Sequence, residues 1–138
     1  MRLPVLQNTY YQGNIMTAQS ILIVEDEGLI ALHLMEILAN AGYRVLDPVA
    51  SGEEALRHLE KNPLPDLVLM DITLDGSLEG IETARQIRKK CTVPVIFLTA
   101  HSNGHIIARA HEVSPCGYII KPVMDKDLLE HVGRALRG

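Results

Sequence analysis

Four short apolar runs along the chain are each followed by a polar residue at their carboxyl end. They are rich in Ile, Leu and Val, contain no charged residue, and cover residues 21–24, 67–70, 93–98 and 117–120. Continuous apolar runs of this length are typical of strands buried on both faces of a parallel sheet. A fifth run, 44–46, is shorter and more polar and is closed by Pro48, which predicts a strand at an edge of the sheet.

Between these runs, apolar residues recur at the spacing of helices that bury one face. Helix by helix, the positions are Ile30, Leu34, Ile37 and Leu38; Ile81, Ala84 and Ile87; Ile106, Ile107 and Ala110; and Leu128, Leu129, Val132 and Leu136. A capping box, Ser51-Gly52-Glu53-Glu54, opens one more helix. Gly42 is predicted to end the first helix, and Asp125 is predicted to cap the last one.

Strands that alternate with helices in this way predict an α/β fold with right-handed crossovers. We expect a single doubly wound parallel sheet of five strands in the order 2-1-3-4-5, with five helices. In such sheets, ligands bind beyond the carboxyl ends of the strands, where the strand order reverses. Residues 20–138 are predicted to form this one domain. Residues 1–19 lack periodicity and are interpreted as an N-terminal extension that is either flexible or not native to the protein.

Composition excludes several classes of function. The net charge of −4 gives no sign of a nucleic-acid-binding surface. Cys91 and Cys116 are isolated and lack metal-ligand spacing, which favours reduced thiols in the cytoplasm. No apolar run reaches the length of a membrane span, and the first twenty residues do not resemble a signal peptide. We therefore expect a cytoplasmic protein that binds neither membranes nor nucleic acid directly.

Three carboxylates follow the two strands that flank the predicted reversal, namely Glu25, Asp26 and Asp71. Carboxylates held close together repel one another unless a cation intervenes, and Mg²⁺ prefers such oxygen ligands. Thr99 and Lys121 end the two remaining buried strands, where a hydroxyl and an ammonium would suit a phosphoryl group. These residue types predict that Asp71 is a nucleophile that forms an acyl phosphate.

Four motifs occur in order at the predicted strand ends. They are Ile23-Val24-Glu25-Asp26-Glu27, Leu69-Met70-Asp71, Leu98-Thr99-Ala100 and Tyr118-Ile119-Ile120-Lys121-Pro122. With these motifs the chain resembles, from about Ile21 to Ala135, the receiver domain of bacterial two-component response regulators. The resemblance implies that a histidine kinase or phosphotransfer protein phosphorylates Asp71. It also implies Mg²⁺, with Mn²⁺ as an alternative ion, held by Glu25, Asp26, Asp71 and the main-chain carbonyl of Thr73.

The resemblance further implies how phosphorylation is read out. The residues expected to bind the phosphoryl group or to switch with it are Thr99, Ala100, Lys121 and Tyr118. The output surface would be the face formed by the fourth helix, the last strand and the last helix, which would bind an output partner or a second copy of the chain. A cis peptide bond between Lys121 and Pro122 is expected, and Thr73 and His101 are expected to tune hydrolysis. The family assists its own phosphorylation and dephosphorylation but turns over no separate substrate.

Two positions depart from the usual pattern of this family. Glu25 stands where aspartate is commoner, and its longer side chain could hold the metal through water. Asp75 stands where many members carry proline, and the loop that contains it is one residue longer before Gly80. Both departures bear on metal affinity and on the choice of kinase.

Three other interpretations remain open. A phosphatase of the haloacid-dehalogenase type also forms an aspartyl phosphate, but it needs D-x-D where this chain has Asp71-Ile72-Thr73. A flavodoxin-like module would need a phosphate loop in place of the acids after the first strand. A pseudo-receiver that acts as a scaffold conflicts with the intact Asp71, Thr99 and Lys121. His101 and His105 have the spacing of two metal ligands on a helix, but no third ligand is evident.

Overall fold

The computed structural model describes residues 18–77, 79–101 and 103–137. The predicted extension therefore lies outside the described residues, apart from its last two positions. The sheet has five parallel strands in the order β3-β2-β4-β5-β6. Their bounds are Arg44–Val45 for β3, Ser20–Val24 for β2, Leu67–Asp71 for β4, Val95–Thr99 for β5 and Gly117–Ile120 for β6. Numbered along the chain, this is the predicted order 2-1-3-4-5, so the fold class is confirmed.

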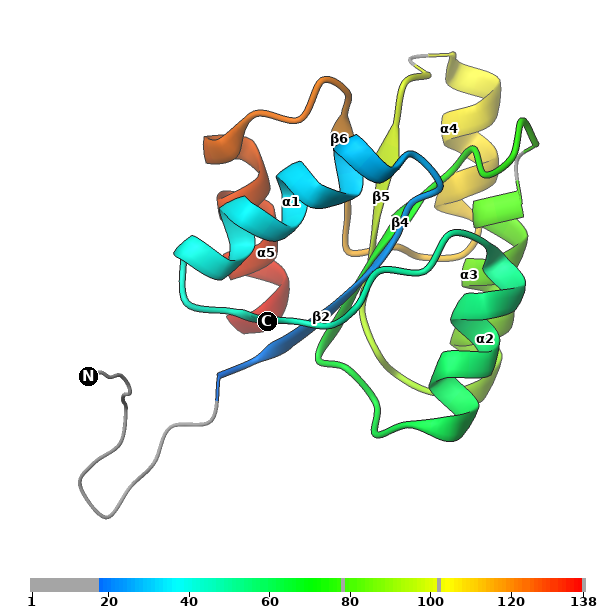
Figure 1. The fold of residues 1–138 in the computed structure, drawn as a ribbon. Helices are drawn as coiled ribbons and strands as arrows, with labels where there is room; N and C mark the ends of the chain where they lie inside the picture. The colour runs from blue at the N-terminus through cyan, green and yellow to red at the C-terminus, as the bar shows by residue number, and fades with distance from the viewer. Residues whose placement is uncertain (1–17, 78, 102, 138) are drawn as a thin grey trace, which may run out of the picture.

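Helices cover both faces of the sheet (Figure 1). Helices α1 (Gly28–Asn40) and α5 (Asp125–Arg137) lie on one face, and α2 (Gly52–Lys61), α3 (Glu79–Lys90) and α4 (Gly104–His111) lie on the other. Alternate residues of the strands belong to two separate hydrophobic clusters, because successive side chains of a strand point to opposite faces of the sheet. In β2, for example, Ile21 and Ile23 pack towards α1 and α5, whereas Leu22 and Val24 pack towards the other three helices.

The central strands β2, β4 and β5 are buried along their whole length, as their continuous apolar sequences predict. Their carboxyl ends lie at one edge of the sheet: Val24 pairs with Met70, Asp71 with Leu98, and Thr99 with Ile120. The polar residues that follow the apolar runs are thus brought to one edge. Within the described residues, no helix is long and apolar enough to cross a membrane.

Local signals at the helix ends agree with the structure in most places. Ser51 Oγ accepts a hydrogen bond from the Glu54 amide at 3.1 Å, as a capping box requires. The Glu54 carboxylate, however, accepts from the Ala50 amide rather than from that of Ser51. Asp125 is the first residue of α5, so its charge favours the helix dipole from within the first turn and the predicted cap is wrong. Gly42 ends α1 with a φ of +99°.

Candidate functional site

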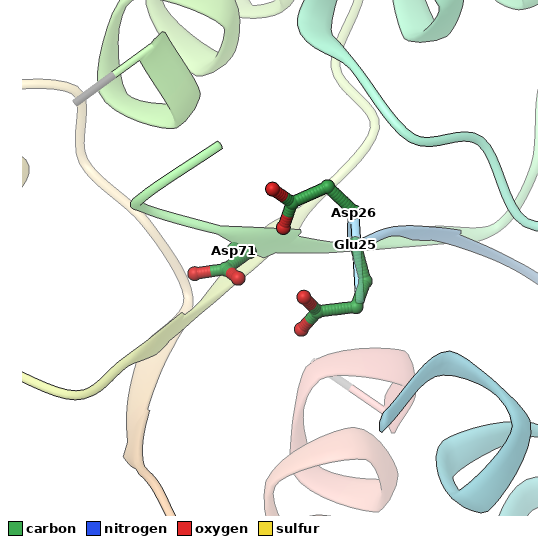
Figure 2. Close-up of side chains that lie close together, drawn as sticks. All are labelled: Glu25, Asp26 and Asp71. Atoms are coloured by element: carbon green, nitrogen blue, oxygen red, sulfur yellow. The ribbon is translucent and has the colours of Figure 1, made fainter. Parts of the chain in front are cut away.

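The three predicted carboxylates converge at the switch point of the sheet. Oxygen atoms of Glu25, Asp26 and Asp71 lie within 4.8 Å of one another (Figure 2). Asp71 is the last residue of β4, and Glu25 and Asp26 directly follow β2. Glu25 and Asp71 are each only 3% exposed, whereas Asp26 is open to solvent. Two of the three charges are therefore removed from water, where they need a compensating cation.

Lys121 supplies a positive charge to the two buried acids. Its Nζ donates to Asp71 Oδ2 at 2.8 Å and to Glu25 Oε1 at 3.1 Å. Burial alone lowers the pKa of the Lys121 ammonium, but the hydrogen bonds and charges of Asp71 and Glu25 outweigh burial and raise this pKa above its ordinary value. Lys121 is thus fully ionised at neutral pH and bridges the ends of β2 and β4.

The ionised form of Glu25 remains unfavourable despite its contact with Lys121. Its burial and the hydrogen bond and charge of neighbouring Asp71 raise the pKa of the Glu25 carboxyl from 4.5 to about 7, although the Glu27 amide and Lys121 act in the opposite direction. The Glu27 amide donates to Glu25 Oε2 at 3.1 Å. One ammonium is therefore not enough to neutralise the cluster, and a further cation would relieve it.

The loop between β4 and α3 folds back on the acids. The Thr73 amide donates to Asp71 Oδ1 at 3.1 Å, and the Asp75 amide donates to Asp26 Oδ2 at 2.9 Å. The loop ends where Gly80 packs on β4: a Cβ atom there would lie 2.0 Å from the Asp71 carbonyl oxygen. Only glycine permits this approach, so the position of α3 relative to the site depends on Gly80.

Thr99 and His101 form a second hydrogen-bonded group beside Asp71. Thr99 Oγ1 accepts from the His101 amide at 2.9 Å and lies 3.4 Å from the His101 carbonyl oxygen, to which it donates. The His101 ring nitrogen Nε2 lies 3.0 Å from Thr73 Oγ1. The loops after β4 and β5 are therefore joined beside the site. Ala100, between Thr99 and His101, is exposed.

Tyr118 lies away from the acids, against α4. Its ring stacks on Phe97 with centroids 6.3 Å apart and meets the edge of the His111 ring at 5.4 Å. The Tyr118 hydroxyl is buried, and no described residue forms a hydrogen bond with it. Burial raises the pKa of this phenol. Beyond β6, the Lys121–Pro122 peptide bond is cis.

Three contacts of the site were not predicted from the sequence: Lys121 with Glu25, Asp75 with Asp26, and Thr73 with His101. The dipeptide Asp75-Gly76 is a strong signal for a tight turn, so the loop that carries the second contact was open to prediction. Among the described residues, the one group of three or more potential metal ligands consists of Glu25, Asp26 and Asp71, so His101 and His105 have no third ligand there. The His105 amide instead donates to the side chain of Asn103 at 2.8 Å.

The comparison with protein families agrees with this geometry. The model of the response regulator receiver domain matches residues 21–133. The chain belongs to this family. Receiver domains are signalling modules of two-component systems, and the strand order and the acidic cluster described above are those of this family.

Curated relatives of this receiver domain are named as regulators. The transcriptional regulatory protein PdtaR of Mycobacterium tuberculosis is 34% identical over 116 residues, which cover 84% of this chain and 56% of that protein. The positive alginate biosynthesis regulatory protein of Pseudomonas aeruginosa is 41% identical over 121 residues, which cover 86% of this chain and 47% of that protein. The chain thus spans about half the length of the curated relatives it matches.

Solved structures show the same receiver fold. The receiver domain of the sensor histidine kinase PA1611 from Pseudomonas aeruginosa, solved with a magnesium ion in its active-site cleft, is 30% identical with a TM-score of 0.78. The match covers 88% of this chain and all (100%) of that one. A CheY-like receiver domain protein from Methanospirillum hungatei is 30% identical with a TM-score of 0.80, and the match covers 88% and 95% of the two chains.

Proposed function

We propose that this receiver domain accepts a phosphoryl group on Asp71 from the phosphohistidine of a kinase or phosphotransfer protein. The observation that carries the proposal is the buried Asp71 carboxylate, which lies 2.8 Å from the Lys121 ammonium and shares a cluster with two further acids. A structural carboxylate needs one cation and no second or third acid. An acceptor of a phosphoryl group needs a nucleophilic oxygen surrounded by groups that bind negative charge.

In the proposed reaction, an oxygen of Asp71 forms a bond to phosphorus while the bond between phosphorus and the donor imidazole nitrogen breaks. The imidazole keeps the electron pair of that bond. Lys121 remains beside the new acyl phosphate and neutralises part of its charge. Ala100, being small and exposed, leaves room for the incoming group. The chemistry is confined to the formation and hydrolysis of the acyl phosphate on Asp71, so we propose a switch with no separate substrate to turn over.

The donor set fits a hard divalent cation. It consists of carboxylate oxygens within 4.8 Å, one of them on Glu25, whose pKa is raised to about 7 by burial and by neighbouring Asp71. Glu25, Asp26, Asp71 and the main-chain carbonyl of Thr73 would hold Mg²⁺, or Mn²⁺ in its place. Because Lys121 already occupies Glu25 Oε1, a contact of Glu25 with the ion through water suits the geometry. The ion would supply charge neutralisation at the phosphoryl oxygens.

This chain offers the donor protein an apolar docking surface beside the site. A groove of about 290 Å³ opens next to Lys121, and its walls are mostly apolar. It is lined by Leu29, Ile30, His33, Leu34, Lys121, Pro122 and Val123. Leu29 is 84% exposed and Leu32, one turn further along α1, is 57% exposed. An apolar helical face next to a reactive group suits a partner that must bring its own side chain to that group.

The proposed readout starts at Thr99. Its hydroxyl is engaged with the main chain of His101, so binding a phosphoryl oxygen requires it to turn away and release the loop before α4. Tyr118, packed between β5 and α4, would change its position with that loop. The face of α4, β6 and α5 exposes Ile120 by 48% and the adjoining Met124 by 60%. We propose that an output partner or a second copy of the chain binds there.

Intact-mass measurement tests the acceptor. The protein is incubated with Mg²⁺ and a small acyl-phosphate donor, as wild type, as Asp71→Asn and as Asp47→Asn. Asp47 is exposed and is not one of the three clustered acids, so it serves as the matched control. We expect one added phosphoryl group on wild type and Asp47→Asn and none on Asp71→Asn. Equal labelling of Asp71→Asn would refute the acceptor, and no labelling of wild type would favour a scaffold that works without phosphorylation.

A further inference from the structure

The loop after β4 contains a two-residue hairpin turn. Leu74 and Ser77 form an antiparallel bridge in which each amide donates to the other's carbonyl, at 2.9 and 3.1 Å. Asp75 and Gly76, between them, have φ angles of 51° and 77°. Positive φ at both central residues defines a type I′ turn, for which Asp-Gly is a favoured sequence. The turn is therefore encoded locally and does not depend on a bound ion.

This turn directs one free amide at the acidic cluster. The hairpin bonds use the amides of Leu74 and Ser77, so the Asp75 amide is left to donate outside the turn. It donates to Asp26 Oδ2 at 2.9 Å. The side chain of Leu74 is fully buried and fixes the base of the turn on the core. The direction of the Asp75 amide thus follows from packing and from turn geometry together.

Asp26 needs such support more than the other two acids. Glu25 and Asp71 are buried and held by Lys121, whereas Asp26 is exposed and has no ion-pair partner among the residues described. A free exposed carboxylate samples several rotamers and loses that freedom when it binds a metal. The Asp75 amide restricts Asp26 beforehand and still leaves its second oxygen and remaining lone pairs for an ion.

We infer that the Asp75 main-chain amide is a positioning group for Mg²⁺ binding, which it promotes by orienting the Asp26 carboxylate. The inference rests on the proposed Mg²⁺ site and adds a role for the loop in which this chain departs from its family. A proline at position 75 has no amide hydrogen and cannot adopt the positive φ, so chains with proline there lack this contact. Outer contacts of this kind typically change metal affinity by about 10- to 100-fold.

Isothermal titration of the unphosphorylated protein with Mg²⁺ alone measures the effect. We expect Asp75→Pro to raise the Kd about tenfold or more. Asp75→Asn keeps the main-chain amide and tolerates positive φ, so its Mg²⁺ affinity should stay close to that of wild type. Ser114→Pro is the matched control: Ser114 also has a positive φ, of 52°, and a bonded amide, but it lies beyond α4, at the opposite edge of the sheet. It should lower stability without changing the Kd.

Two further measurements separate positioning from general damage. The melting temperatures of metal-free Asp75→Pro and Ser114→Pro show whether the two prolines disturb the fold to a similar extent. In wild type, the Asp75 amide should show a downfield proton shift and slow hydrogen exchange before any metal is added. An unchanged Kd in Asp75→Pro, or an equal rise in Ser114→Pro, would overturn the inference. Absence of Mg²⁺ binding by wild type would instead refute the metal site itself.

Discussion

Replacing Glu25 with glutamine tests the electrostatic description of the site directly. In the folded, metal-free protein, burial and the neighbouring Asp71 raise the pKa of Glu25 from 4.5 to about 7. Between pH 4.5 and about pH 7, Glu25 is therefore still protonated in the folded state but already ionised in the unfolded state. Because the folded state binds more protons in this interval, its stability must fall as the pH rises through it. Above about pH 7 both states are ionised and this contribution stays constant.

The size of the effect follows from the same two values. One pKa unit corresponds to about 1.4 kcal/mol, so the change from 4.5 to about 7 is worth about 3 kcal/mol. This sets an upper limit, since exposed Asp26 leaves one side of the cluster open to water. Glutamine carries no charge at any pH and nearly matches the shape of protonated glutamate. Metal-free Glu25→Gln should thus gain up to about 3 kcal/mol over wild type at pH 8 and almost nothing at pH 4.5.

Urea unfolding in the presence of a metal chelator, at half-unit steps from pH 4.5 to pH 8, measures this difference. Contributions from titratable groups that are common to both proteins cancel in the comparison. Lys121, whose pKa is raised above its ordinary value, loses its stabilising charge only in alkaline solution. Glu36→Gln, at an exposed position of α1, controls for the loss of one negative charge.

The stability difference between Glu25→Gln and wild type must grow with pH and level off near pH 7, while Glu36→Gln must show no such trend. Parallel curves for wild type and Glu25→Gln would show that Glu25 ionises normally and that Lys121 alone satisfies the cluster. Saturating Mg²⁺ should also remove the trend in wild type, because a bound cation lowers the pKa of a neighbouring carboxyl.

Three other substitutions probe separate parts of the site. Lys121→Ala leaves two buried acids without their ammonium and should destabilise the metal-free protein by about 3 to 5 kcal/mol in urea unfolding, while calorimetry should still detect Mg²⁺ binding. Gly80→Ala forces a Cβ atom to within 2.0 Å of a carbonyl oxygen and should cost about 3 kcal/mol or more, whereas Gly104→Ala, with nothing within 4 Å, should be neutral in the same assay. Thr73→Val removes the hydrogen bond to His101 and should shorten the lifetime of the aspartyl phosphate about fivefold, which corresponds to the free energy of one hydrogen bond. Replacing His101 with alanine in the same protein should shorten this lifetime no further.

Local sequence signals were sufficient to predict the fold. Continuous apolar runs identified the buried strands, and the short polar run 44–46 identified the edge strand β3, of which the structure keeps Arg44–Val45. The strand ends then placed the acids, the hydroxyl and the ammonium at one edge. Boundaries were less certain: β5 begins at Val95 rather than at residue 93, because Pro94 supplies only its carbonyl to the ladder, through the Val68 amide.

Hydrogen-bond partners within the site were harder to predict, since they depend on rotamers and on loop conformation. The sequence contains three acids near one ammonium and gives no ranking of the pairs. The link between Thr73 and His101 joins two loops that are 28 positions apart in sequence, and no local pattern indicates it. The pKa of Glu25 likewise depends on its burial, which requires the packed structure.

Strand alternation, however, explains which groups meet. Glu25, Asp71 and Lys121 each lie two positions after a residue of the cluster packed on α1 and α5, namely Ile23, Leu69 and Ile119. They therefore share that face, which accounts for their mutual hydrogen bonds.

Asp26, Thr99 and Tyr118 have the opposite parity. Asp26 and Thr99 lie two positions after Val24 and Phe97, which belong to the cluster packed on α2, α3 and α4, and Tyr118 itself packs against that cluster. Their side chains therefore belong to that face of the sheet. The proposed acceptor thus lies on one face, while Thr99 and Tyr118, which would report its state, lie on the other. A signal from the proposed acyl phosphate would have to cross the sheet. We therefore propose that Thr99, the last residue of β5, which follows the β-partner of Asp71, carries it.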